Sequence, residues 1–92
     1  MSEITWIEQW YQRQCDGNWE HQHGIKVETL DNPGWHVEID GLPPSPSPMR
    51  YAEEVSETSW IRCSLDDGRF DGYGDPRRLQ EIFALFQRWT EL

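Results

Sequence analysis

Two neighbouring segments alternate between apolar and polar residues, and this pattern constrains the fold more than any other feature of the chain. Alternation over residues 25–30 and 35–40 is typical of strands that bury one face. The connector, residues 30–34, reads Leu-Asp-Asn-Pro-Gly and is rich in turn formers, so the segments are predicted to form a β-hairpin. A sheet with one apolar face needs a second layer to cover that face.

The register of this hairpin follows from keeping the large apolar groups together, because a shift of one residue would mix the two faces. A five-residue connector satisfies this condition. The predicted pairs are Ile25 with Ile39, Val27 with Val37 and Thr29 with Trp35 on the apolar face, and Lys26 with Glu38 and Glu28 with His36 on the polar face.

Both ends of the chain have the spacing of amphipathic helices. Near the start, apolar residues three and four apart predict a helix from Glu3 to Gln14, with Ser2 as N-cap and an end near the left-handed Gly17. Near the end, Asp75 as N-cap and Pro76 as first helical residue predict a helix that continues to about Thr90. Its apolar stripe is Leu79, Ile82, Phe83, Phe86 and Trp89.

Further strands are predicted between the hairpin and the last helix. The proline-rich residues 42–48 are expected to form a loop, residues 50–57 an edge strand and residues 60–65 a better-defined strand. A turn at Asp66-Asp67-Gly68 leads to a strand over residues 69–73. The sequence therefore predicts one α+β domain over residues 1–92, with a four- to five-stranded antiparallel sheet and both helices on one face.

The charge balance limits which partners the chain can bind. Seventeen acidic and eight basic residues give a formal net charge of -9, which repels nucleic acid and anionic membranes and attracts a basic protein. An acidic surface also serves solubility alone, so both interpretations stay open. The N-terminus lacks a signal-peptide pattern and no stretch has the ~20 apolar residues of a membrane span, so a cytoplasmic protein is expected.

Residues able to carry chemistry are few and scattered. Cys15 and Cys63 are isolated, and Cys63 alternates with apolar residues as a core position does. His21 and His23 lie near Cys15, so a small metal- or thiol-dependent enzyme is one alternative. No known ligand spacing completes that set, and we predict no catalytic residue, cofactor or metal.

Acidic residues are interleaved with aromatic residues in the second half of the chain. Aromatic anchors supply much of the energy of protein interfaces, while carboxylates steer a basic partner. A core with a solvated rim would have the same composition. The partner-binding residues predicted from this pattern are Glu53, Glu54, Trp60, Asp66, Asp67 and Asp71.

Three longer stretches resemble the immunity protein 53 family. They are Trp-Ile-Glu-Gln-Trp-Tyr at residues 6–11, Cys-Asp-Gly-Asn-Trp-Glu-His at 15–21 and Gly-Ile-Lys-Val-Glu-Thr-Leu-Asp-Asn-Pro-Gly-Trp at 24–35. The similarity continues through Trp60-Ile61 and Gly74-Asp75-Pro76, and departs at residues 43–48.

The resemblance implies a cytosolic antitoxin that binds the cognate toxin domain of a bacterial polymorphic secretion system and has no catalytic residue. With the charge, it favours a non-catalytic inhibitor whose acidic face covers a basic active site, such as that of a nuclease. The alternatives are the small enzyme using Cys15, His21 and His23, and an interaction module unrelated to toxins.

Overall fold

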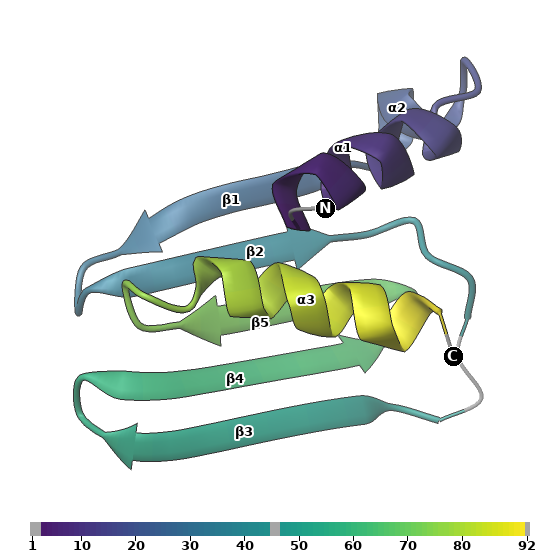
Figure 1. Ribbon diagram of the computed structural model, residues 1–92. Coiled ribbons are helices and arrows are strands. Elements are labelled where there is room, and N and C mark those ends of the chain that lie inside the picture. Colours follow the sequence, from purple (N-terminus) through teal and green to yellow (C-terminus); the bar gives the residue numbers. More distant parts are fainter. Residues whose placement is uncertain (1–2, 45–46, 92) are drawn as a thin grey trace.

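The computed structural model describes residues 3–44 and 47–91, which form an antiparallel sheet with two longer helices. The strand order is β1-β2-β5-β4-β3. Figure 1 shows α1 and α3 on the same face of this sheet, which confirms the predicted α+β architecture. The elements are α1 (Glu3–Gln14), α2 (Trp19–Gln22), β1 (Ile25–Leu30), β2 (Gly34–Ile39), β3 (Met49–Ser56), β4 (Ser59–Asp66), β5 (Arg69–Gly74) and α3 (Leu79–Thr90).

The β1–β2 hairpin has the predicted register. Ile25 lies opposite Ile39 and Val27 opposite Val37, and the polar pairs follow on the other face. Val37 and Ile39 are fully buried, whereas Val27 on the edge strand is 43% exposed. The apolar pattern thus set the register, although the helices bury the apolar side chains of β2 more completely than those of β1.

The other three strands also follow the alternation in the sequence. Ile61, Cys63 and Leu65 on β4 are buried, while β3 is an exposed edge strand. Asp67 and Gly68 both have positive φ in the predicted turn between β4 and β5. The last strand, β5, pairs with β2 on one side and β4 on the other, so it is the middle strand of the sheet.

The core between the layers is largely aromatic. Phe86 of α3 has edge contacts with Trp10 of α1 at a centroid distance of 5.1 Å and with Phe70 of β5 at 5.0 Å. Edge-to-face pairs at these distances add about 1 kcal/mol each to the energy of burial. These few large rings join α1, α3 and the sheet in a chain with limited aliphatic content.

Glycines on β5 allow α3 to approach the sheet closely. Gly72 and Gly74 alternate with the outward residues of β5 and face the helix. A Cβ atom on Gly72 would collide with Ile82, and one on Gly74 would lie 2.8 Å from the Cβ of Arg78. The helix therefore rests directly on the backbone of the middle strand.

Three local expectations need correction or comment. The last helix begins at Leu79, not Pro76, and its N-cap residue Arg78 makes no side-chain capping bond. Asp75, the predicted N-cap, instead closes a turn that precedes the helix, because its carboxylate accepts from the Arg77 N–H and its carbonyl accepts from the Arg78 N–H. Residues 19–22, between the first predicted helix and the hairpin, where no helix was predicted, form the helical turn α2. The predicted N-cap Ser2 lies outside the described residues, as do residues 45 and 46 of the proline-rich loop.

We expect Gly72→Ala to lower the free energy of unfolding by about 2 kcal/mol, because the added methyl group overpacks the contact with Ile82. Urea denaturation measures the change. The matched control is Gly24→Ala, since a Cβ atom there would meet no atom within 4 Å. Equal losses in the two variants would contradict close packing of α3 on β5.

Candidate functional site

The face of the sheet opposite α1 and α3 is open: within residues 3–44 and 47–91 no helix covers it (Figure 1). The strand registers place alternate residues of every strand on this face. Its charge is mixed, because basic residues accompany the acidic ones. The acidic residues are Glu28, Glu38, Glu54, Asp66 and Asp71, and the basic ones are Lys26, Arg50, Arg62 and Arg69.

A histidine between two carboxylates lies near the middle of the open face. His36 is only 9% exposed, its Nδ1 lies 3.0 Å from Glu28 Oε1 and its Nε2 lies 3.1 Å from Asp71 Oδ1. Tyr73 stacks on the imidazole with a centroid distance of 4.3 Å. The hydrogen bond to His36, with the charge of Lys26, lowers the pKa of Glu28 below its ordinary value.

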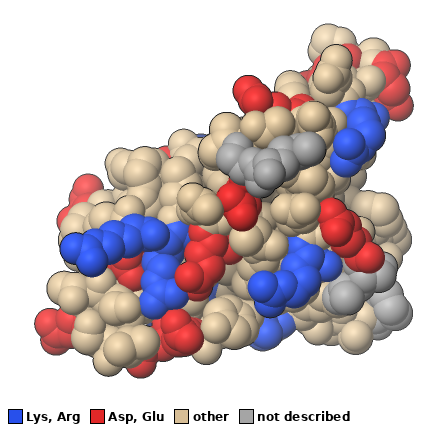
Figure 2. Space-filling view, viewed as in Figure 1, with Lys and Arg blue, Asp and Glu red and all other residues tan. Residues whose placement is uncertain are grey.

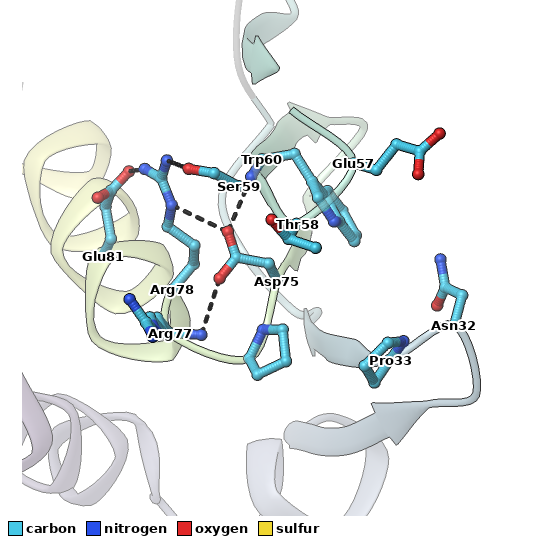
Figure 3. A pocket seen from close by; sticks show the side chains of 11 residues that line it. Asn32, Pro33, Glu57, Thr58, Ser59, Trp60, Asp75, Arg77, Arg78 and Glu81 are labelled. Carbon is cyan, nitrogen blue, oxygen red and sulfur yellow. Dashed lines mark hydrogen bonds and ion pairs between the residues drawn. The ribbon is translucent and has the colours of Figure 1, made fainter. Parts of the chain in front are cut away.

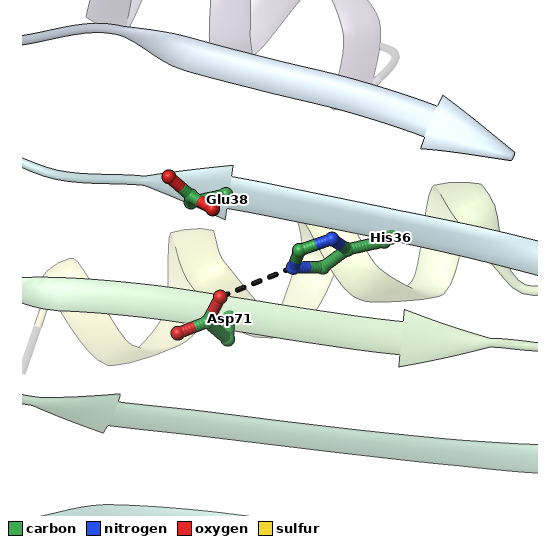
Figure 4. Close-up of side chains that lie close together, drawn as sticks. All are labelled: His36, Glu38 and Asp71. Carbon is green, nitrogen blue, oxygen red and sulfur yellow. Dashed lines mark hydrogen bonds and ion pairs between the residues drawn. The ribbon is translucent and has the colours of Figure 1, made fainter. Parts of the chain in front are cut away.

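Arg69 extends this network along the face. Its guanidinium donates to Glu38 Oε1 at 2.8 Å and to Asp71 Oδ2 at 3.0 Å. Figure 4 shows Glu38 and His36 on β2 beside Asp71 on β5. These carboxylates are therefore largely engaged within the protein.

Trp60 stands between two adjoining hollows at one end of the sheet. Figure 3 shows its ring between Asp75 on one side and Asn32 on the other. The first hollow, about 550 Å³, is lined by Asn32, Pro33, Glu57, Thr58, Ser59, Trp60, Asp75, Pro76, Arg77, Arg78 and Glu81. The second, about 340 Å³, opens on the helix-free face and is lined by Leu30, Asn32, Glu54, Ser56, Glu57, Trp60, Arg62 and Tyr73.

The buried carboxylate of Asp75 fixes the position of Trp60. Asp75 is 2% exposed and accepts hydrogen bonds from the backbone N–H groups of Trp60 and Arg77, both at 2.8 Å, and from Arg78 Nε at 3.2 Å. Burial opposes its ionisation, but these hydrogen bonds outweigh burial and lower the pKa of Asp75. The start of β4 is thereby tied to the segment that leads into α3.

Arg78 joins the same network to β3. Its guanidinium lies 3.2 Å from Glu53 and 2.7 Å from Glu81, and donates to the Ser59 hydroxyl at 3.0 Å. The side chain of Arg78 is only 15% exposed, and these carboxylate partners neutralise its charge. Glu53, the register partner of the buried Ile61, lies on the helix side of the sheet.

The six residues predicted to bind a partner do not form one patch. Glu54, Trp60, Asp66 and Asp71 share the helix-free face, Glu53 is on the opposite side, and Asp67 is in the β4–β5 turn. Trp60 and Asp66 lie six residues apart on β4, about 20 Å along the strand. On the helix side, Figure 2 shows acidic and basic side chains interspersed, with no extended area of one sign.

The residues of the alternative enzyme hypothesis do not form a group of potential metal ligands in the described part of the chain. Cys15 Sγ donates to the Tyr11 carbonyl, His21 is exposed, and the ring of His23 lies beside Trp19 with Nδ1 3.6 Å from Asp40. Burial raises the pKa of the Cys63 thiol to about 12, which keeps it protonated. The alternative gains no support from this arrangement.

Sequence reasoning missed the clusters around His36 and Asp75. The predicted pairing of Glu28 with His36 was a usable signal for the first. Asp71 could not be added, because nothing local indicates that β5 pairs with β2. The ion pairs of Arg78 were missed because the predicted helix began at Pro76, which made Arg78 one of its ordinary residues.

These features define a small α+β protein with an open sheet face suited to binding. Comparison with family models places it among the immunity proteins, which act against toxins: the model described as Immunity protein 53 matches residues 4–91. The chain belongs to the Immunity protein 53 family, as the sequence resemblance implied, and its expected partner is a toxin. The searches of curated proteins and of solved structures found no match.

No helix in the described part of the chain combines the length and apolar character that crossing a bilayer requires.

We expect Asp75→Asn to lower the free energy of unfolding at pH 7 by about 2 kcal/mol, because it weakens the hydrogen bonds that the buried carboxylate accepts from Trp60, Arg77 and Arg78, while Arg78 keeps its other carboxylate partners. The folded pKa is lowered, so the stabilising contribution is complete above the ordinary value of 3.8 and is lost as the pH falls below it. Urea denaturation over a pH series measures both effects.

The control for this prediction is Glu8→Gln on the exposed side of α1, which should leave the stability unchanged. A difference between the wild type and Asp75→Asn that stayed constant well below pH 3.8 would contradict the assignment.

Proposed function

We propose that this immunity protein neutralises its toxin without catalysis, by binding it through the Trp60 end of the helix-free face. The observation that carries the proposal is the position of Trp60 between two open hollows, held by the buried Asp75. A partly buried indole on a fixed backbone offers a large apolar contact at little entropic cost, which is typical of interface anchors.

Neighbouring residues suit such an anchor. Leu30 and Tyr73 line the same hollow as Trp60 on the helix-free face, which gives a small apolar area with a polar rim. Gly34 supports the arrangement, because a Cβ atom there would lie 3.3 Å from the Trp60 ring and 2.5 Å from the Gly74 carbonyl oxygen.

Carboxylates near Trp60 favour a basic partner. In the described part of the chain Glu54 and Glu57 have no ion pair, whereas Glu53 and Asp71 are neutralised by Arg78 and Arg69. Unpaired carboxylates together with a net charge of -9 attract a cationic protein and raise its rate of encounter. Arg62 and Arg77 also line the hollows and can pair with acidic residues of the partner.

A nuclease domain is the partner class that best fits this charge, because an enzyme that holds a phosphate backbone must be cationic. The proposed contact set retains Glu54 and Trp60, adds Glu57, and extends along the face toward Asp71. Asp66, at the far end of β4, and Asp67, in the turn that follows it, reach only a partner that spans the whole face. Glu53 affects the proposed interface only indirectly, through its ion pair with Arg78, which lines the first hollow.

We expect Trp60→Ala to weaken binding to the cognate toxin domain by about 30-fold, the effect of losing an anchor worth roughly 2 kcal/mol. Calorimetry with the purified toxin domain gives the dissociation constant, and co-expression gives the protection of cells. Tyr11→Ala is the matched control, since Tyr11 is an exposed aromatic on α1. Full affinity in Trp60→Ala would overturn the proposed interface.

The double variant Glu54→Lys, Glu57→Lys should slow association with the toxin at least tenfold at low salt, with a smaller effect at high salt, because screening removes long-range attraction. Stopped-flow kinetics over a salt series measures this. The control is Glu8→Lys on the helix side. Equal association rates for the double variant and for Glu8→Lys would contradict the electrostatic part of the proposal.

A further inference from the structure

We propose that His36, Glu38 and Asp71 form a binding site for one divalent transition-metal ion on the helix-free face. The inference is independent of toxin binding. In the described residues they are the one group of three potential metal ligands that lie together, with one ligand atom of each residue within 4.8 Å of the others.

Strand geometry brings the three ligands together. His36 and Glu38 are two residues apart on β2, so they point to the same face, and Asp71 of β5 is the register partner of Glu38 (Figure 4). Metal–ligand distances of about 2.1 Å place ligand atoms roughly 3.5 Å apart. Small side-chain rotations are enough to close the site from its present spacing.

A second layer of contacts orients the imidazole. Glu28 Oε1 lies 3.0 Å from Nδ1, and Tyr73 stacks against the ring with an interplanar angle of 2°. This leaves Nε2 directed at Asp71 Oδ1, 3.1 Å away. A carboxylate on one ring nitrogen and a metal on the other is the usual arrangement of metal-binding histidines.

Arg69 orients both carboxylates without using all of their oxygens. Its guanidinium donates hydrogen bonds to Asp71 Oδ2 at 3.0 Å and to Glu38 Oε1 at 2.8 Å, and a longer one of 3.4 Å to Asp71 Oδ1. Asp71 Oδ1 therefore faces mainly His36, and Glu38 keeps its second oxygen. A metal bound there would retain Arg69 as an outer partner of its ligands.

The local charge leaves room for a cation. Glu28, Glu38 and Asp71 contribute -3 and Arg69 contributes +1, which gives -2 with a neutral imidazole; Lys26, 3.9 Å from Glu28, reduces this to -1. To face an ionised carboxylate at 3.1 Å, Nε2 must carry a proton or bind a cation. The competing reading is a metal-free network in which a proton takes this position.

The ligand set selects the class of metal. One imidazole nitrogen with two carboxylate oxygens favours Zn²⁺, Co²⁺ or Ni²⁺ over Mg²⁺ and Ca²⁺, which prefer oxygen ligands alone. Three protein ligands leave at least one coordination position for water or an external donor. Side-chain exposures of 29% for Glu38 and 22% for Asp71 give the ion access from solvent.

The test is titration of EDTA-treated, dialysed protein with Zn²⁺ by calorimetry and with Co²⁺ by absorption spectroscopy. We expect one equivalent to bind with micromolar affinity or tighter. His36→Gln and Asp71→Asn should weaken binding at least 100-fold, and Glu28→Gln about tenfold through loss of the outer contact. His21→Gln, which removes an exposed histidine, should bind as the wild type does.

Absence of saturable binding, or affinity unchanged in His36→Gln, would establish the metal-free network and overturn the proposal. Loss of binding in His21→Gln alone would also overturn it. If His36→Gln does not fold, Co²⁺ added to the isotope-labelled wild type replaces it, because a bound ion must selectively broaden the ring resonances of His36. Toxin affinity, measured separately with and without Zn²⁺, reports on the proposed interface and does not decide this test.

Discussion

The close packing of α3 on the middle strand of the sheet underlies the rest of the structure. It depends on Gly72 and Gly74, since a side chain at either position would strike the helix. Because the helix lies on the backbone of β5, Phe86 reaches Phe70 and Trp10, and a few aromatic rings complete the core. Alternation along β5 then sends the remaining side chains to the opposite face. One strand therefore both seats the helix and supplies the open surface.

The charged residues divide into two groups with different physical roles. Asp75 and Asp71 are engaged by arginines and hydrogen bonds, and they hold strands and helix starts in place. Glu54 and Glu57 have no such partner in the described structure, so their charge is directed at the solvent. Net charge alone does not locate an interface, because a paired carboxylate projects little field into solvent. When the paired carboxylates are set aside, the unpaired ones, Glu54 and Glu57, lie beside Trp60 and define an acidic surface there.

Membership of the Immunity protein 53 family and the physical reading of the surface support different parts of the conclusion. The family match over residues 4–91 identifies an immunity protein with a toxin partner. The open face, the anchored Trp60 and the unpaired carboxylates indicate where and how the proposed contact is made. The network around His36 occupies the same face and shares Tyr73 with the hollow beside Trp60, and the proposed contact set extends toward Asp71, so a metal there and a toxin at Trp60 are distinguished by separate measurements.

The sequence by itself determined the elements whose pattern is local: the helix Glu3–Gln14, the β1–β2 register and the turn after Asp66. These follow from apolar periodicity and turn chemistry within a few residues. Only the tertiary structure decided the start of α3, the separation of Glu53 from Glu54, and the meeting of His36 with Asp71. The physical reason is that Asp75 bonds to Trp60, fifteen positions away, and β5 pairs with β2 across an intervening hairpin. Contacts between distant segments leave no periodic trace in the sequence, so the site emerged only when the sheet was assembled.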